Sequence, residues 1–260
     1  MKSKIKSFFR RWPKFYNFLK RGSITFNGIQ RRLIGTKLEE KYWATRHLRK
    51  GDDWEKEGDD WVRGYWDSRD HSHRGFLMER IFKFSPSSVL EVGCNCGPNL
   101  YILAKRFPDA EIRGIDINPM AVQKGNEWFA QEGISNVKLS VGRADDLRQF
   151  RDKSFDVVFT DAVLIYIGPD KIRKVVEEML RVTRKVLIFL EWHSFDSKCN
   201  PLGVYVGHWM RDYTALLKEF VSENNIKVTK MPKDLWPDKN WQKWGGVIEV
   251  VLQGRRFPKA

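Results

Sequence analysis

Residues 88–100 read Ser88-Val89-Leu90-Glu91-Val92-Gly93-Cys94-Asn95-Cys96-Gly97-Pro98-Asn99-Leu100. The first five residues form a short, mostly apolar run that is typical of a buried parallel strand. Gly93 and Gly97 then predict a tight turn, and the residues that follow are compatible with a helix. A strand, a glycine turn and a helix in this order point backbone N–H groups and the positive end of a helix at a ligand.

The glycine spacing bears on which ligand this turn binds. A dinucleotide fingerprint reads G-x-G-x-x-G, whereas this chain has Gly93-x-x-x-Gly97, with Glu91 inside the end of the strand. Asn95 occupies a position where a middle glycine is common, and Asn tolerates a positive φ better than most residues. A second strand, predicted over residues 114–118, contains Asp116, 19 residues after Gly97. A carboxylate at that place can accept both hydroxyl groups of a ribose.

These two motifs resemble the first two motifs of the class I S-adenosylmethionine-dependent methyltransferases, and the resemblance runs from about Arg74 to the C-terminus. It implies an α/β fold: a Rossmann-like, seven-stranded, mostly parallel sheet with helices on both faces and an antiparallel C-terminal hairpin. It also implies S-adenosyl-L-methionine as the cofactor. A Rossmann-like domain that binds another nucleotide is the alternative interpretation.

The resemblance further implies a set of cofactor-binding residues. In the family, the loop after the third strand (here Val137–Val141) holds the adenine edge through an acid and a backbone N–H. Arg143 stands at the usual acid position, so the role is expected to pass to Asp145, with Ala144 supplying its backbone. The fourth strand, predicted over residues 154–161, ends at Asp161. The complete predicted cofactor set is Glu91, Gly93, Cys94, Asn95, Gly97, Asp116, Ile117, Ala144, Asp145 and Asp161.

Two further features bear on the methyl acceptor. The Asn/Asp-Pro-Pro-aromatic signature of many methylases that act on nucleobase amines is missing, because residues 161–164 read Asp-Ala-Val-Leu. Residues 91–100, together with residues 167–171 and 207–212, look similar to methylases associated with pseudaminic acid and other cell-surface sugars. This looser resemblance favours a small-molecule or sugar/lipid-conjugate acceptor.

Three side chains near the predicted ends of strands are candidate catalytic residues: Tyr166, His193 and His208. Ligands of α/β sheets bind at these ends, and a histidine there can act as a base at neutral pH. A base is needed only when the acceptor must lose a proton during attack. Each lone histidine can equally be a structural residue. No pair of His or Cys residues has metal-site spacing, so we predict no metal.

The net charge of +14 lies almost entirely at the N-terminus, since residues 1–50 hold 15 Lys and Arg against only Glu39 and Glu40. We therefore divide the chain into a basic amphipathic extension over 1–50, an aromatic and acidic segment over 51–73, and a methyltransferase domain over 74–260. Such a distribution argues against a catalytic domain coated for nucleic acid. The aromatic residues of 51–73, among them Trp54, Trp61, Tyr65 and Trp66, predict either a lid over the cofactor or ordinary packing.

Residues 1–21 combine an aromatic stripe with a cationic face, the composition of a helix that lies in a membrane interface. The stripe consists of Ile5, Phe8, Phe9, Trp12, Tyr16 and Leu19. Docking onto the domain or a disordered basic tail are the alternatives. No apolar run reaches 18 residues and the N-terminus lacks the apolar core of a signal peptide. Three cysteines make no disulfide framework, so we expect reduced thiols in a cytoplasmic protein, held peripherally at the inner face of the membrane.

Taken together, the patterns predict a methyltransferase that acts on a small molecule or a sugar/lipid conjugate near a membrane surface. Two other functions stay open at this level. One is an RNA methyltransferase that uses its basic tail as an electrostatic anchor. The other is a non-catalytic protein that uses the cofactor fold as a scaffold.

Overall fold

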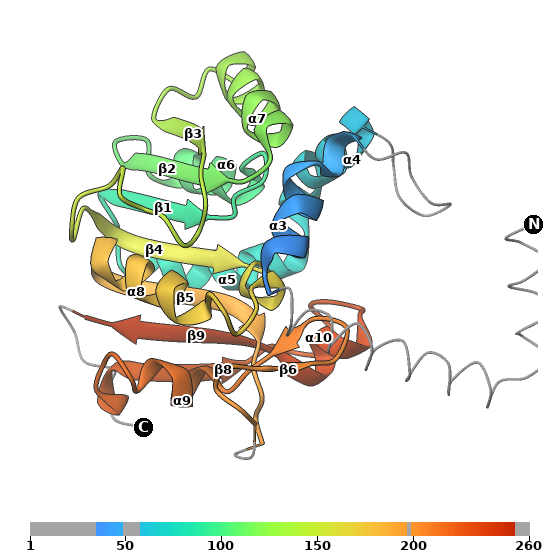
Figure 1. Cartoon of the computed structure of the whole chain (residues 1–260). Helices are drawn as coiled ribbons and strands as arrows, with labels where there is room; N and C mark the ends of the chain where they lie inside the picture. The colour runs from blue at the N-terminus through green and yellow to red at the C-terminus, as the bar shows by residue number, and fades with distance from the viewer. Residues whose placement is uncertain (1–34, 49–57, 197–198, 253–260) are drawn as a thin grey trace, which may run out of the picture.

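A computed structural model describes residues 35–48, 58–196 and 199–252 (Figure 1). The amphipathic stripe of residues 1–21 and Trp54 lie outside these ranges, so the predictions made for them stay predictions. No helix in the described part of the chain is long and apolar enough to cross a membrane.

Seven strands form one sheet in the order β3-β2-β1-β4-β5-β9-β8 (Figure 1). The strands from β1 to β5 pair in parallel, and β9 pairs antiparallel with both β5 and β8. This arrangement confirms the predicted mostly parallel sheet with an antiparallel C-terminal pair. The strands are β1 Ser88–Val92, β2 Glu111–Asp116, β3 Val137–Val141, β4 Phe155–Asp161, β5 Thr183–Trp192, β8 Ile226–Lys230 and β9 Gly245–Val251.

The apolar runs in the sequence become the buried central strands. Every residue of β1 is buried, as is all of β4 except Asp161 at its end. Because both faces of a parallel sheet are covered, its strands are apolar on both sides rather than alternating. A separate small hairpin of β6 (Val204–Tyr205) and β7 (Trp209–Met210) lies beyond the end of β5.

Helices cover both faces of the sheet, as predicted. One apolar core packs α4, α5, α6, α7 and α10 against the sheet, and a second packs α8 and α9 against the other face. The α-helices are α3 Lys37–Ala44, α4 Gly58–Asp67, α5 Ser72–Phe82, α6 Pro98–Arg106, α7 Pro119–Gln131, α8 Ile172–Val182, α9 Tyr213–Leu217 and α10 Lys239–Trp244. The 3-10 helices are η1 Arg46–Leu48, η2 Ser68–Asp70, η3 Leu164–Tyr166 and η4 Glu223–Asn225.

Local caps explain where several helices begin. The Asn118 side chain accepts hydrogen bonds from the N–H groups of Met120 and Ala121, so α7 begins at Pro119 as predicted. Helix α9 is short and covers only Tyr213–Leu217. It begins no earlier because Met210 pairs in the β6–β7 hairpin and Asp212 caps α9 through the N–H of Ala215.

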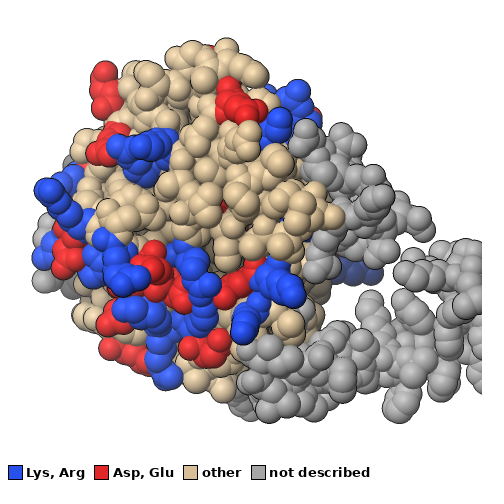
Figure 2. Space-filling model, turned by 45° about the horizontal axis from the view of Figure 1, so that its top comes forward, with Lys and Arg blue, Asp and Glu red and all other residues tan. Residues whose placement is uncertain are grey.

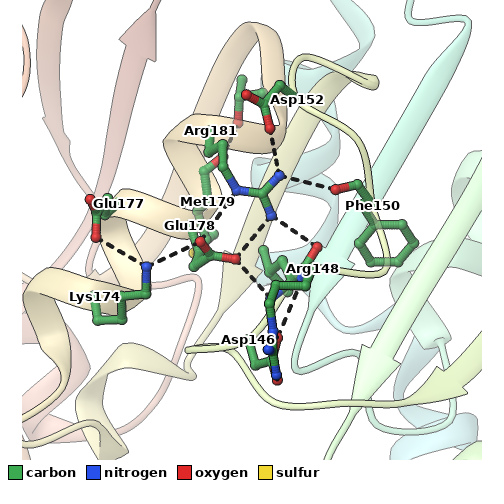
Figure 3. Close-up of polar contacts among 11 residues, drawn as sticks. Asp146, Arg148, Phe150, Asp152, Lys174, Glu177, Glu178, Met179 and Arg181 are labelled. Atoms are coloured by element: carbon green, nitrogen blue, oxygen red, sulfur yellow. Dashed lines mark hydrogen bonds and ion pairs between the residues drawn. The ribbon is translucent and has the colours of Figure 1, made fainter.

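Arg181 on α8 fastens the loop that follows β3 (Figure 3). Its guanidinium donates to the backbone carbonyls of Leu147 and Phe150 and forms ion pairs with Asp152 and Glu178. Glu178 in turn accepts from the N–H of Leu147. Since a planar guanidinium presents several donors in a fixed geometry, one side chain can hold two turns of the loop at once. The loop that carries the predicted adenine contacts is therefore held against α8.

Candidate active site

The glycine turn after β1 needs the backbone freedom that its glycines provide. Gly93 has φ +78° and Gly97 has φ +83°, values that side chains rarely adopt. A Cβ at Gly93 would lie 2.4 Å from Cγ2 of Val163, in the loop after β4. The N–H groups of Gly93 and Cys94 both donate to the carbonyl of Ile115 on β2. Asn95 has φ +50°, in line with its tolerance for this region.

Asp116 ends β2 beside this turn. Its carboxylate accepts hydrogen bonds from the backbone N–H groups of Asn95 and Asn118, at 2.8 Å each. Burial raises the pKa of Asp116, whereas these backbone donors act in the opposite direction. The side chain is thus held in place from both sides by the two loops that would surround a bound nucleoside.

Two further carboxylates end adjacent strands and share one amide. Asn99, in the first turn of α6, donates to Glu91 at 2.7 Å and to Asp161 at 3.1 Å. In each carboxylate the other oxygen, Oε2 of Glu91 and Oδ1 of Asp161, is buried and has no hydrogen-bond partner in the described part of the chain. An unsatisfied buried acceptor costs free energy. Two such atoms side by side therefore suit a ligand with several N–H donors.

Asp161 also meets two cationic or titratable side chains from α5. Nε2 of His73 lies 3.1 Å from its Oδ2, and Nη1 of Arg74 lies 3.2 Å from the same oxygen. Burial acts to raise the pKa of Asp161, but His73, Arg74 and Asn99 together lower it to about 2. The predicted cofactor set did not include Asn99, His73 or Arg74, because their contacts with Asp161 join distant parts of the chain.

All of these groups open into one cavity of about 1170 Å³ at the carboxyl ends of the parallel strands. Nine of the ten predicted cofactor residues line it: Glu91, Gly93, Cys94, Asn95, Asp116, Ile117, Ala144, Asp145 and Asp161. Gly97 is not among the lining residues. A Cβ there would lie 2.8 Å from the Phe129 ring, so the structure places this glycine in a packing role between α6 and α7.

A charge cluster connects the loop after β3 to α3 across the cavity. Asp145 forms ion pairs with Arg143 and Lys171, and Glu40 on α3 pairs with the same two cations. Arg143 therefore forms an ion pair with Asp145, and it does not take over the predicted role of Asp145 at the adenine. Burial acts to raise the pKa of Asp145, but the two cations outweigh it and lower the pKa.

Helix α3 lies over the carboxyl ends of β1 and β4 (Figure 1). None of its residues is buried, but Trp43 packs against Trp61 and Tyr166, and polar contacts also hold the helix there. Besides Glu40, the backbone N–H and the hydroxyl of Thr36 donate to Asp170, and the Asn118 side chain donates to the carbonyl of Trp43. The described part of the N-terminal extension, which contains α3, therefore forms one wall of the cavity.

The cavity also contains an aromatic chamber, which we define by an unbroken series of ring contacts whose members, except Trp192, line the cavity. Successive ring centroids lie between 4.2 and 6.1 Å apart, a range in which aromatic rings attract one another. The series runs Trp43, Tyr166, His208, Trp192, Trp241, Trp236, His73 and His71. These residues come from α3, η3, the β6–β7 hairpin, β5, α10, the loop before α10, and the start of α5.

The predicted catalytic residues divide between the cavity and the core. Tyr166 and His208 both line the cavity, with ring centroids 5.0 Å apart. Burial raises the pKa of Tyr166 well above its ordinary value, so its hydroxyl is protonated at neutral pH. His193 is not among the lining residues. It is buried, its Nδ1 accepts from the N–H of Tyr213 at 3.3 Å, and burial lowers its pKa.

Buried polar groups hold Tyr166 and His208 in place. Arg211, fully buried, donates to the carbonyls of Leu164 and Ile167 on either side of Tyr166, and to Leu202 ahead of the hairpin. Glu191 accepts from the backbone N–H groups of residues 163–165. Because these bonds are internal and backbone-directed, they fix the turn rather than a particular ligand.

The aromatic segment before α5 divides between the cavity and the core. Trp61 and Tyr65 on α4 line the cavity, whereas Trp66 packs on Trp128 and Phe129 of α7. Trp66 therefore fits the packing interpretation, and a lid over the cofactor stays a prediction.

Comparison with known proteins now bears on this geometry. The family described as "Methyltransferase domain" matches residues 89–186, from β1 into β5. These residues form a class I methyltransferase domain. S-adenosylmethionine is the cofactor of this family, as the resemblance implied. A geranyl diphosphate C-methyltransferase from Streptomyces coelicolor, solved with geranyl diphosphate and S-adenosylhomocysteine, shares the fold, with a TM-score of 0.51 at 11% identity over 64% of this chain and 71% of that one.

Curated relatives match the methyltransferase domain in sequence. A Haemophilus influenzae protein of unknown function is 29% identical over 57% of this chain and 54% of its own length. A Synechocystis 2-methyl-6-phytyl-1,4-hydroquinone methyltransferase is 33% identical over 48% of this chain and 38% of its own length. The chain therefore spans about half, or less, of the length of these relatives.

The residues at the site fit the family's cofactor. The unpartnered oxygens of Glu91 and Asp161 suit the ammonium of its methionine part, and Asp116 retains lone pairs for the ribose hydroxyls. The turn at Gly93 has no room for a side chain, as expected where backbone approaches a ligand closely. The charge cluster around Asp145 and the apolar Ile117 and Ala144 would flank the base.

Proposed function

We propose that the protein transfers the methyl group of S-adenosylmethionine to a small molecule or to the exposed group of a sugar or lipid conjugate. The observation that carries this proposal is the continuity of the cavity, which runs from the cofactor turn at Gly93 into the aromatic chamber. A cofactor and an acceptor bound in its two halves would meet at the loop after β4. Holding two reactants in one enclosed site is the main contribution of an enzyme to such a displacement.

The chamber is better suited to a small or prenyl-type acceptor than to a polymer. Its walls are largely aromatic and include residues of α3 and α4, a lining that is typical of sites for small apolar ligands. Relatives named for the methylation of a phytyl hydroquinone and of geranyl diphosphate support an acceptor with an apolar body. The described surface in Figure 2 shows basic and acidic side chains interleaved in a band rather than one basic patch.

Within this reaction the chain's own residues have separate roles. S-adenosylmethionine supplies an electrophilic methyl group on a sulfonium. Glu91, Asp116 and Asp161 hold the cofactor, and the aromatic chamber excludes water from the acceptor. Tyr166 and His208 contact the acceptor from the chamber wall.

Calorimetry with purified full-length protein tests the cofactor site. We expect S-adenosylmethionine to bind and Asp116→Ala to weaken its affinity by roughly 10–100-fold, because removing the partner of a buried hydrogen bond costs about 1–3 kcal/mol. Asp109→Ala is the matched control: it removes an exposed carboxylate just before β2, at the opposite end of the strand that carries Asp116, and Asp109 does not line the cavity. Absence of cofactor heat with the wild type would refute the assignment. Turnover is then sought with a panel of small phenols, prenyl quinols, amines and sugar conjugates.

We also propose that residues 1–21 bind an anionic membrane and bring the chamber to its surface. Two observations support this. The described chain enters at α3, directly on the rim of the cavity, and Leu38 and Leu48 on this segment are 37% and 72% exposed. An acceptor carried by a lipid would then enter the chamber from the membrane side.

Vesicle sedimentation tests the anchor. Each basic residue near an anionic surface is worth about 1 kcal/mol, so half of the eight in residues 1–21 would give measurable adsorption. We expect wild-type protein to sediment with phosphatidylserine vesicles at low salt and the double variant Phe8→Glu, Phe9→Glu to stay in solution. The control is a double variant outside the aromatic stripe, Ser3→Glu with Asn17→Glu. It adds the same charge and should still bind the vesicles. Wild-type protein that ignores vesicles but binds RNA with a steep salt dependence would favour the RNA enzyme instead.

A further inference from the structure

A buried hydrogen-bond chain leads from Asp161 to a histidine on the cavity wall. Oδ2 of Asp161 lies 3.1 Å from Nε2 of His73, and Nδ1 of His73 lies 2.5 Å from Nδ1 of His71. His73 is 4% exposed and stacks on Trp236, whereas His71 is half-buried and lines the cavity. Asp161 lies 88 residues from His73 in the chain, yet the two side chains and His71 form one hydrogen-bonded line that ends at the cavity.

The positions of the protons along this series of hydrogen bonds can be assigned by starting from Asp161. Asp161 is ionised and accepts only, so Nε2 of His73 carries a proton. We assign Nδ1 of His73 as an acceptor, which places the proton of the short ring-to-ring contact on Nδ1 of His71. The backbone N–H of His73 lies 3.4 Å from the same atom, at the outer limit of a hydrogen bond, and is the weaker contact. Nε2 of His71 is left with a lone pair.

His71 also lies on the acceptor side of the cavity. Its ring joins the aromatic chamber through His73 and Trp236. Within the described residues, no hydrogen bond is formed with its Nε2. Burial lowers the pKa of His71, and His73 and Arg74 lower it further, while Asp161 acts in the opposite direction. The imidazole is therefore neutral at physiological pH.

We propose that His71 is the base that takes a proton from the methyl acceptor, with His73 and Asp161 as the groups that position it and fix its tautomer. This inference rests on the proposed function. As the acceptor atom bonds to the methyl carbon, the carbon–sulfur bond breaks and its electron pair stays on sulfur. The proton of the acceptor goes to Nε2 of His71. The proton on Nδ1 of His71 shifts toward His73, where the carboxylate of Asp161 stabilises the positive charge.

The first test needs no acceptor. In the full-length protein labelled with ¹⁵N-histidine, we expect a His71 signal with a protonated Nδ1 and an unprotonated Nε2 at pH 7. A strongly downfield proton should report the short contact with His73. Both signals should disappear in His71→Asn and persist in the matched variant His208→Asn. A protonated Nε2 on His71, or a downfield signal that His71→Asn leaves in place, would overturn the proposal even if no acceptor is ever found.

The second test uses an acceptor that the panel identifies. His71→Gln should lower kcat by roughly 100-fold or more, since general-base catalysis contributes about 10²–10⁴-fold, with the affinity for S-adenosylmethionine unchanged. The acid limb of the wild-type pH profile should lie below pH 6.5 and vanish in His71→Gln. His73→Asn should lower kcat while leaving KM unchanged, as a positioning residue would. An acid limb that survives in His71→Gln but vanishes in His208→Gln would assign the base to His208 instead.

Discussion

Gly93→Ala is expected to remove most cofactor binding and to destabilise the domain, although it adds a single carbon. The added Cβ would lie 2.4 Å from Cγ2 and 2.9 Å from Cγ1 of Val163. The neighbour is a branched side chain at a turn that Glu191 holds through backbone hydrogen bonds, so it has little freedom to move. Overpacking of this kind costs about 1–3 kcal/mol, in addition to about 1 kcal/mol for a positive φ. Displacement of the turn should weaken S-adenosylmethionine binding at least about tenfold.

Gly133→Ala separates the two costs. Gly133 also has a positive φ, +67°, but a Cβ there meets nothing within 4 Å. Both variants therefore carry the same backbone strain, and only Gly93→Ala carries the clash. We expect urea unfolding to place Gly133→Ala about 1 kcal/mol below the wild type, with unchanged cofactor affinity in calorimetry. Equal effects of the two variants would show that backbone strain alone, and not the approach to Val163, limits this position.

The parts of the site that the sequence predicts are those that a local pattern encodes. The glycine turn, Glu91 and Asp116 belong to contiguous strand-turn segments, and the parallel sheet brings their ends to one edge. Gly97 shows the limit of this reasoning, because spacing alone does not tell a glycine beside a ligand from one beside Phe129. Residue 118 was predicted at the end of the second strand, whereas the structure makes Asn118 the cap of α7.

The acceptor side was less predictable because it is assembled from distant segments. His73 and Asp161 are 88 residues apart, and Trp236 reaches His73 only through the fold of the last two strands. His193 and His208 look alike in the sequence as loop histidines after β5. Only the hairpin geometry sends His208 to the cavity, while the N–H of Tyr213 holds His193 in the core. Tertiary contacts, rather than local propensity, therefore determine whether each histidine lies at the cavity or in the core.

Asp161→Asn is expected to destabilise the protein by about 3–5 kcal/mol at pH 7, because it leaves the buried guanidinium of Arg74 without its anion. The amide keeps the volume of the carboxylate but carries no negative charge. Loss of Oδ1 as an anionic acceptor should also weaken S-adenosylmethionine binding. Asp146→Asn is the control. Arg148 lowers the pKa of Asp146 to about 2 as well, yet that pair is exposed and solvent screens it, so stability should not change measurably.

The stabilisation by Asp161 should depend on pH in a direction that its pKa shift predicts. The pKa of Asp161 falls from 3.8 to about 2 on folding, so the unfolded state binds more protons between these values. The stabilisation is therefore fully present above pH 4 and is lost as the pH falls toward 2, an amount of about 2 kcal/mol. In urea titrations at successive pH values, the gap between wild type and Asp161→Asn should be constant from pH 7 to 5 and should narrow below pH 4. A gap that stays constant down to the lowest pH at which both proteins fold would mean that Asp161 contributes through its shape and not through its charge.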